Sequence, residues 1–326
     1  MPDGLYPIAK KLLFKLGAED AHRLTLAGMR VAQKFGQLAP MFPIPADLHK
    51  PVECMGLTFP NAVGLAAGMD KSASTIDAFG AIGFGHIEAG TVTPRPQDGN
   101  PKPRLFRLVE EEALINRMGF NNPGVDRFVR NLERVETFAG IVGASIGKNA
   151  DTPNDEAIDD YVKAFRAVYL HSDYIAINIS SPNTKGLRDL QESESSGALI
   201  KRLQEERQQL HDASEVNPPD RRPLVVKFSP DLAEDHICGL ADLCNRMKID
   251  AVVVANTTLA RTGVESHPLH HEKGGLSGKP LATRASEQLK IWRRELADAI
   301  PIIAVGGIMT GDDARQRIDE GAALIQ

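Results

Sequence analysis

The 326-residue sequence predicts an α/β protein in which a (β/α)8 barrel follows two N-terminal helices. From residue 61 onward, short apolar runs alternate with helical patterns, which is typical of βαβ units and a parallel sheet. Eight such runs occur, and eight is the strand number of the TIM barrel. An open doubly wound sheet is the alternative, but the first strand-to-helix turn, at 66–70, lacks the G-x-G-x-x-G fingerprint.

The N-terminal extension begins with a short, basic, amphipathic helix. Its apolar residues recur at the i, i+3, i+4, i+7 spacing of one helical face, and they are Leu5, Ile8, Ala9, Leu12, Leu13 and Leu16. The other face carries Lys10, Lys11 and Lys15. A helical cap on the main domain and an interfacial membrane contact both remain open here, because a leucine-rich face beside lysines suits a lipid surface.

A second helical pattern follows, with acidic residues at 19 and 20 in its first turn. Its apolar side is formed by Ala21, Leu24, Ala27 and Val31. Pro40, Pro43 and Pro45 then break the pattern, so 39–46 is predicted to be a linker. The predicted division is therefore a helical extension with its linker over 1–46 and a barrel over 47–326.

The barrel elements follow in order along the chain. The predicted strands are 62–66, 85–90, 141–146, 174–179, 224–228, 251–255, 302–305 and 323–326. These runs are almost continuously apolar, as expected of strands with both faces buried. The predicted helices are 72–82, 124–133, 155–170, 198–213, 232–247, 283–297 and 312–320.

Composition excludes several classes of protein. A net charge of -5 supplies no global positive field for nucleic acid, so no nucleic-acid partner is expected. The 3 cysteines lack C-x-x-C spacing, which favours core thiols over a disulfide framework or a zinc site. No stretch approaches the roughly 18 apolar residues of a membrane span, and no signal peptide is evident.

In a (β/α)8 barrel, the chemistry lies at the C-terminal ends of the strands. Here amides, hydroxyls and lysines dominate those ends, and paired carboxylates and histidine clusters are absent, which argues against glycoside hydrolysis and catalytic metal. Asparagine presents both a donor and an acceptor, so several of them match a planar ligand whose edge alternates C=O and N–H, such as a pyrimidine. Lys71 and Lys227 could balance negative charge on a carboxylate or a reduced cofactor.

Two glycine-rich segments give weaker signals. The Gly306-Gly307 pair after strand seven allows close approach of the backbone to a ligand, and 274–278 is a loop that either approaches a cofactor or merely turns. His267, His270 and His271 have tempting spacing, but they lack acidic or thiol companions, so no metal site is expected.

Five segments together resemble the dihydroorotate dehydrogenase family, and the similarity runs from about residue 5 to 326. They are AGMDK at 67–71, GTVTPRPQ at 90–97, NRMGFNN at 116–122, NISSPNT at 178–184 and GGLSG at 274–278. More specifically, the chain is similar to the class 2, quinone-dependent enzymes of bacteria. Ser181 stands where class 1 enzymes have a catalytic cysteine, and the amphipathic extension precedes the barrel.

The resemblance implies that FMN lies across the top of the barrel and that dihydroorotate gives a hydride to it and a proton to Ser181. The implied flavin contacts are Ala67, Gly68, Met69, Asp70, Lys71, Thr91, Ser145, Asn178, Lys227, Gly278, Gly306 and Gly307. The implied substrate contacts are Lys71, Asn116, Arg117, Met118, Gly119, Phe120, Asn178, Asn183, Asn256 and Thr257. By the same analogy, the quinone enters near His22 and Arg107.

The implied function is oxidation of dihydroorotate to orotate in pyrimidine biosynthesis, with a membrane quinone as acceptor. The implied location is peripheral, at the cytoplasmic face of the bacterial cell membrane, with the N-terminal helices on the membrane surface. A serine hydroxyl is a poor base in water, so Ser181 serves only if its proton is relayed onward and fixed donors stabilise the developing enolate.

Three departures from the family pattern leave alternatives open. Ser145 replaces a flavin-contacting Asn, and Ala255 replaces a Thr and is left out of the candidate site. The family continues past strand eight with residues that bind the FMN phosphate and with a final helix, whereas this chain ends at Gln326, so we expect a barrel truncated after strand eight. The alternatives are a non-catalytic barrel scaffold, or a class 1 enzyme with a soluble acceptor.

Overall fold

The computed structural model describes residues 5–36, 48–213 and 221–326. At its centre, eight parallel strands lie in the order β3-β4-β7-β8-β9-β10-β12-β13. A bridge between Val63 and Ile325 closes the barrel, where the Ile325 amide donates to the carbonyl of Ala62 at 3.0 Å. The strands are β3 (Gly64–Leu65), β4 (His86–Val92), β7 (Ile141–Ile146), β8 (Tyr174–Asn178), β9 (Leu224–Phe228), β10 (Ala251–Val254), β12 (Ile302–Ala304) and β13 (Leu324–Ile325). The predicted (β/α)8 barrel is confirmed.

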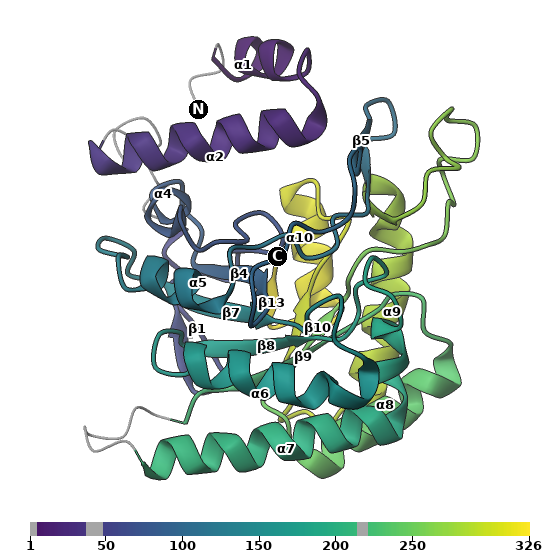
Figure 1. Cartoon of the computed structure of the whole chain (residues 1–326). Helices are drawn as coiled ribbons and strands as arrows, with labels where there is room; N and C mark the ends of the chain where they lie inside the picture. The colour runs from purple at the N-terminus through teal and green to yellow at the C-terminus, as the bar shows by residue number, and fades with distance from the viewer. Residues whose placement is uncertain (1–4, 37–47, 214–220) are drawn as a thin grey trace.

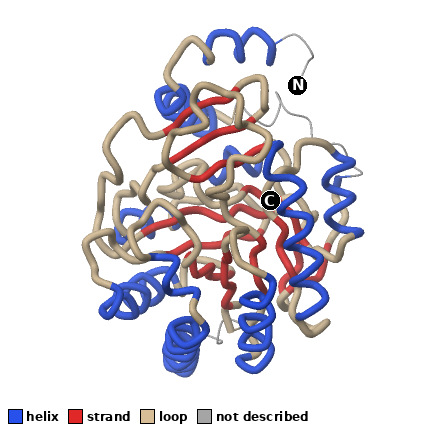
Figure 2. Tube along the Cα trace, turned by 90° about the vertical axis from the view of Figure 1, so that its right-hand side faces the viewer, coloured by secondary structure: helices blue, strands red, loops and turns tan. Residues whose placement is uncertain are grey.

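Helices surround this barrel, as Figures 1 and 2 show. They are α4 (Ile76–Gly80), α5 (Val125–Leu132), α6 (Ala157–Val168), α7 (Ser193–Asp212), α8 (Glu234–Met247), α9 (Ala282–Glu295) and α10 (Gly311–Asp319). Each overlaps its prediction, but α4 starts four residues later than the predicted 72. The reason is the Asp70 carboxylate, which accepts hydrogen bonds from the Ser72 amide at 3.1 Å and the Thr75 amide at 2.7 Å and so holds a turn there.

The sequence did not predict two small sheets. A hairpin of β1 (Val52–Cys54) and β2 (Leu57–Phe59) turns through Met55 and Gly56, both with positive φ. A second sheet combines β5 (Leu105–Leu108), β6 (Ala113–Asn116) and β11 (Gly275–Gly278). The last of these corrects the prediction of a loop at 274–278, and the pairing was hidden because β11 joins β6 from far along the chain.

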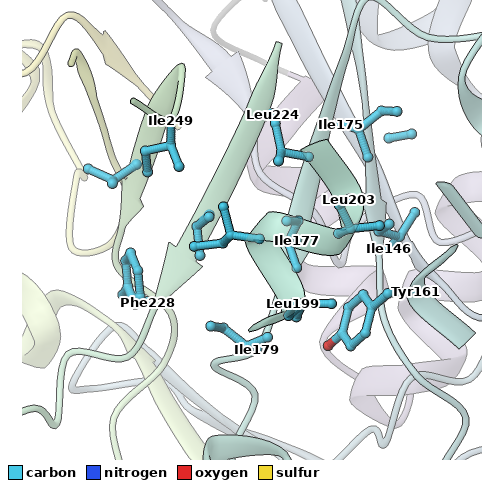
Figure 3. Close-up of a cluster of buried hydrophobic side chains, with 14 of the residues drawn as sticks. Ile146, Tyr161, Ile175, Ile177, Ile179, Leu199, Leu203, Leu224, Phe228 and Ile249 are labelled. Atoms are coloured by element: carbon cyan, nitrogen blue, oxygen red, sulfur yellow. The ribbon is translucent and has the colours of Figure 1, made fainter. Parts of the chain in front are cut away.

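Alternate residues of each strand supply two separate apolar layers. In β8, Tyr174 and Ala176 belong to the cluster inside the barrel, whereas Ile175 and Ile177 belong to the layer between strands and helices. Figure 3 shows this outer layer, with Ile175 and Ile177 close to Leu199 and Leu203 of α7. Every residue of β8, β9 and β10 is buried, so the prediction of strands buried on both faces is confirmed.

The N-terminal helices α1 (Leu5–Leu13) and α2 (Ala18–Lys34) lie together at one end of the barrel, and α2 lies above α4 in Figure 1. The Gln33 side chain donates to the Ser74 carbonyl at 3.3 Å and accepts from the Ala78 amide at 3.2 Å. Leu24 and Val31 are 56% and 58% exposed, so two residues of the predicted apolar side of α2 face away from the protein core. The predicted linker at 39–46 lies outside the described residues.

Candidate active site at the barrel mouth

A cavity of about 480 Å³ opens at the C-terminal ends of the barrel strands. Its size is within the range typical of small-molecule sites. The predicted residues that line it are His22, Ala67, Gly68, Met69, Lys71, Thr91, Asn116, Met118, Gly119, Phe120, Asn178, Ser181, Asn183, Lys227, Asn256, Thr257 and Gly306. Segments up to about 280 residues apart in the sequence therefore meet around one space.

Hydrogen bonds among side chains orient the amides of this cavity. Asn178 Nδ2 donates to Thr91 Oγ1 at 2.7 Å, and Asn183 Nδ2 donates to Asn116 Oδ1 at 3.1 Å. Asn256 Nδ2 donates to the Ser180 hydroxyl at 2.9 Å. Each amide still has further donor or acceptor capacity for a ligand. The cavity wall thus presents fixed donors and acceptors from several strand ends.

Ser181 lies in the loop after β8 and is 6% exposed. Its Oγ accepts a hydrogen bond from the Asn183 amide at 3.3 Å, across the intervening Pro182. In the described part of the chain, the hydroxyl proton of Ser181 has no hydrogen-bond acceptor, and the buried Thr184 hydroxyl of the same loop has no partner. The loop therefore fixes the position of Ser181 Oγ while leaving its proton free to move.

Two lysines bring positive charge to the cavity. Lys227 is 4% exposed, and its Nζ lies 3.7 Å from Oε1 of the fully buried Glu88. Lys71 Nζ donates to the Gly68 carbonyl at 2.5 Å. Burial lowers the pKa of Lys71 to about 8, because the charged form loses hydration, and the charge of Arg104 lowers it further. Lys71 is therefore mostly protonated at pH 7, and it loses its proton at only slightly higher pH.

The 118–120 segment covers the cavity with a strained backbone. Phe120 has a φ of 54°, in the left-handed region that a bulky residue rarely adopts. Asn122 Nδ2 donates to the Phe120 carbonyl at 2.6 Å and to Thr93 Oγ1 at 2.8 Å, which holds this conformation. Such strain persists only where the surroundings impose it, and it is common at functional sites.

Comparison with known proteins identifies the family. The model of the dihydroorotate dehydrogenase family matches residues 50–326. The chain belongs to the dihydroorotate dehydrogenase family. A curated relative from Akkermansia muciniphila is 49% identical over 100% of this chain and 92% of its own length, and it is named dihydroorotate dehydrogenase (quinone). One from Chromobacterium violaceum, with the same name, is 50% identical over 99% of this chain and 92% of its own length.

Solved structures of the family agree. A dihydroorotate dehydrogenase (DHODH) from Eimeria tenella, in complex with ferulenol, superimposes with a TM-score of 0.86 at 36% identity, covering 97% of this chain and 88% of that one. The ligand-free form of that enzyme gives a TM-score of 0.85 at 37% identity, covering 94% of this chain and 88% of that chain. The resemblance deduced from the sequence motifs is confirmed.

Dihydroorotate dehydrogenases are flavin-dependent in general, and the cavity of this chain fits such a group. A Cβ built on Gly68, whose φ is 113°, meets no heavy atom within 4 Å, so the cavity wall offers bare backbone there. Lys227 Nζ has no hydrogen-bond acceptor among the described residues and can serve a carbonyl or anionic edge. Asn178 and Thr91 lie on the same wall. This donor set suits a planar ring system that carries oxygen and nitrogen atoms.

Two of the predicted flavin contacts lie behind the cavity wall. The Asp70 carboxylate is buried and accepts from the amides and hydroxyls of Ser72 and Thr75, so it shapes the turn that follows Gly68. Ser145 Oγ lies 2.9 Å from Thr91 Oγ1 and is fully buried. These side chains support residues of the cavity rather than line it, and whether they contact flavin stays a prediction.

Gly278, Gly307 and Arg117 also lie outside the cavity lining, whereas Gly306 belongs to it. Because Gly306 and Gly307 have no side chains, Leu281 and the Ala282 backbone can pack closely against them, so this pair also serves the packing of the start of α9. Gly278 lies in β11 against the Glu112 carbonyl. Arg117 donates from Nη1 to Glu272 Oε2 at 2.7 Å and from Nη2 to the Pro103 carbonyl at 2.8 Å, away from the space its neighbours line.

A second cavity of about 1040 Å³ lies between α2 and the barrel loops, and His22, Lys71 and Met118 line both cavities. Burial lowers the pKa of His22 to about 4, because the charged ring loses hydration, and nearby Lys71 lowers it further. Arg107 donates to the Leu16 carbonyl at 2.9 Å, and its guanidinium lies 4.7 Å from the centre of the Phe14 ring. Arg107 thus contacts the connection between α1 and α2, whereas His22 lies on α2 and borders both cavities.

Some lining residues were missed from the sequence. They are Ala66, Leu105, Leu114, Ala255, Ser277, Leu281 and Val305, so the omission of Ala255 was wrong with respect to the cavity wall. These side chains are mostly apolar and carry no chemical signature. Glu88 was also missed, although a carboxylate within the apolar strand β4 is itself a signal of a buried charge pair.

Two further findings concern the part of the chain that the structure describes. No described helix is long and apolar enough to cross a membrane. Groups of three or more potential metal ligands are also absent from residues 5–36, 48–213 and 221–326. His267 Nδ1 instead accepts a hydrogen bond from the Leu269 amide at 3.0 Å.

Proposed function

We propose that this protein oxidises dihydroorotate to orotate in pyrimidine biosynthesis and passes the electrons to a quinone. The observation that carries the proposal is the single cavity in which Ser181, an asparagine cluster and two lysines meet, in a chain of this family. It supplies a base, a set of amide partners for a pyrimidine, and positive charge, which is what the reaction needs.

Four asparagines and Lys71 are proposed to bind the substrate. Asn116, Asn178, Asn183 and Asn256 present amide groups that pair with the ring C=O and N–H groups of dihydroorotate. Lys71 faces the same cavity and provides a counter-charge for the substrate carboxylate. Met118, Gly119, Phe120 and Thr257 complete the wall and exclude water. Arg117, which the resemblance assigns to the substrate, is proposed to hold the adjoining loop through Glu272.

Ser181 is proposed to remove the proton from substrate C5. Its Oγ is fixed by the Asn183 amide, so the hydroxyl is aimed without a strong base beside it. The Ser181 proton must therefore leave before or during the step, and the buried Thr184 hydroxyl of the same loop is proposed to relay it onward to water. Fixed amide donors and Lys227 then stabilise the negative charge that develops.

The cofactor is proposed to be FMN, held by the residues that the resemblance assigns. Bound there, FMN would supply an acceptor for the hydride of substrate C6 and a donor of the two electrons to the quinone. Gly68 offers it backbone without a side chain, Lys227 offers an ammonium, and Thr91 and Asn178 offer hydrogen-bonding groups. Ala67, Met69 and Gly306 line the same space. Four further assigned residues lie behind the cavity wall and are proposed to support the residues that line it; they are Asp70, Ser145, Gly278 and Gly307.

The extension over 1–46 is proposed to serve the quinone and the membrane, and 47–326 to serve flavin and substrate. The cavity beneath α2 shares His22, Lys71 and Met118 with the substrate cavity, so the two cavities adjoin at these side chains. Leu12, Leu16, Leu24 and Val31 expose apolar surface on this extension. We therefore propose a peripheral position at the cytoplasmic face of the bacterial cell membrane, with dihydroorotate and the quinone as partners and no nucleic acid or metal.

An absorption spectrum of the purified protein tests the proposal. We expect a yellow protein whose flavin band bleaches on anaerobic addition of dihydroorotate and returns on addition of a soluble quinone analogue. A colourless protein that does not take up FMN would overturn the flavin assignment. Return of the band with fumarate or NAD, but not with the quinone analogue, would instead favour a class 1 enzyme.

A further inference from the structure

One arginine outside the cavity joins two of its walls. Arg188 lies in the short 3-10 helix η3 (Leu187–Gln191), which follows the Ser181 loop. Its side chain is 20% exposed and all three guanidinium nitrogens donate hydrogen bonds. Nε donates to the Ser180 carbonyl at 3.0 Å, Nη2 to the Thr257 carbonyl at 3.0 Å and Nη1 to Asp231 Oδ2 at 2.9 Å.

The two carbonyls belong to the parts of the site where position matters most. The Ser180 carbonyl is part of the peptide bond that leads into Ser181, the proposed base. Thr257 lines the substrate cavity, next to Asn256. A planar guanidinium has its donors in a rigid fork, so it fixes both peptide planes relative to each other.

Asp231 extends this arrangement to a third loop. It follows β9, and its carboxylate also accepts from the Leu259 amide at 2.8 Å and from the Thr258 hydroxyl. Arg284 Nε lies 3.3 Å from the other carboxylate oxygen but donates its hydrogen bond to the Pro230 carbonyl. The Arg188–Asp231 pair therefore connects the loops after β8, β9 and β10, whereas Arg284 contacts the loop after β9 only.

We propose that Arg188, fixed by Asp231, is a positioning residue that holds the Ser181 loop against the Thr257 loop in the reactive arrangement. The inference rests on the proposed function of the cavity. Arg188 touches no reacting atom; it acts through the Ser180 and Thr257 backbone. Misplacement of a reacting group by about 1 Å can cost roughly 10²-fold in rate, so removal of this fork should affect the chemical step.

The test is anaerobic stopped-flow reduction of the flavin by dihydroorotate in the holoenzyme. We expect Arg188→Ala to lower the limiting rate at saturating dihydroorotate by about 10²-fold, and to change the dissociation constant of orotate much less, since Lys71 and the asparagines remain. Millimolar guanidinium should restore part of the lost rate in Arg188→Ala and leave the wild type unchanged. Arg284→Ala is the matched control, because it also takes an arginine from Asp231, and it should reduce at nearly the wild-type rate.

The results that would overturn the proposal differ from those that would count against the proposed function. A wild-type limiting rate in Arg188→Ala, or an equal loss in Arg284→Ala, would show that Arg188 does not position the loops. If Arg188→Ala does not retain flavin, Arg188→Lys carries the test: it keeps the charge beside Asp231 but not the fork, so at least a tenfold slower limiting rate is expected, and a wild-type rate would overturn the proposal. Failure of the wild type itself to bleach would instead count against the proposed function.

Discussion

The barrel mouth and the N-terminal extension are held in place by different means. In the barrel, β8, β9 and β10 are buried along their whole length, and their ends carry side chains already bonded to one another. The extension has no fully buried residue in α2; it is attached by the partly buried Leu26 and Met29, which pack against the core, and by a few polar contacts. The strongest is Glu19 with Arg104, at 2.8 and 3.1 Å.

Under the proposed function, substrate chemistry and quinone access therefore belong to separable parts of the fold. A site built on buried strands is positioned by the core, which keeps its geometry when the surface changes. A helix pair attached by a few contacts leaves room for a large apolar molecule to enter, and it can be disturbed without unfolding the barrel. A change in one region should therefore leave the activity of the other region intact.

Deletion of residues 1–46 should have the largest effect. Quinone turnover should fall to background, because the second cavity loses the wall supplied by His22 and its neighbours. Reduction of the flavin by dihydroorotate should persist, since Ser181 and the asparagines belong to the barrel. Steady-state assays with a quinone analogue and anaerobic stopped-flow reduction measure the two halves. Loss of both would show that the helices are needed for the barrel itself.

Ser181→Ala should impair the other half-reaction, which is reduction of the flavin by dihydroorotate. Removal of a general base typically costs about 10²–10⁴-fold, so reduction of the flavin should slow by that amount. Reoxidation of chemically reduced enzyme by quinone should keep its rate. Ser172→Ala is a matched control, because Ser172 is also buried but donates to the Val168 carbonyl outside the cavity. Reduction of the Ser181 variant at the wild-type rate would remove Ser181 from the role of base.

Orotate binding should depend on pH through Lys71, at the boundary between the regions. With a pKa of about 8, the protonated fraction falls from roughly 0.9 at pH 7 to roughly 0.1 at pH 9, so affinity should drop about tenfold over that range. Calorimetric titration with orotate checks this expectation, and Lys71→Gln should abolish the pH dependence of binding.

The lowered pKa of Lys71 also predicts that the free energy of unfolding of the free protein rises with pH from about pH 8 towards the ordinary lysine pKa, since the unfolded chain binds more protons than the folded one in that range.

Glu19→Gln should give the smallest effect. The amide keeps the shape of Glu19 but loses the charge pair with Arg104, which retains the Asp98 and Asn100 carbonyls as acceptors. We expect the KM for a quinone analogue to rise a few-fold while flavin reduction is unchanged, because Glu19 ties α2 to the barrel loop through Arg104. Asp312→Asn is the control, because Asp312 forms an exposed pair with Arg315 and lines neither cavity. A slower flavin reduction in Glu19→Gln would contradict the separation of the two regions.

Much of the barrel could be predicted because its elements are local and strongly patterned. The uninterrupted apolar run of 224–228 can be satisfied only by burial on both faces, and its observed bounds are Leu224–Phe228. The hairpin at 52–59 has three-residue strands, which carry too little pattern to detect. The β6–β11 pairing joins residues about 160 positions apart, and no local signal contains it.

The candidate site was predictable for a different reason. Asn178, Asn183 and Ser181 follow a strand, and strand ends of a parallel barrel meet at one mouth, so these positions could be assigned from the order of the chain. The roles of the neighbouring residues were harder to predict. Asp70 and Ser145 lie beside lining residues in the sequence or the sheet, yet their side chains are used by Thr75 and Thr91.

Hydrophobic periodicity and motif order are properties of the chain, so they were enough to predict the barrel, the residue types at its mouth and the family. The folded protein was needed to show which of those residues face the cavity, that Glu88 lies beside Lys227, and that Arg188 joins the Ser181 and Thr257 loops. The reason is physical: hydrogen-bond geometry and burial depend on distances between segments remote in the chain, and those distances are fixed only when the barrel closes.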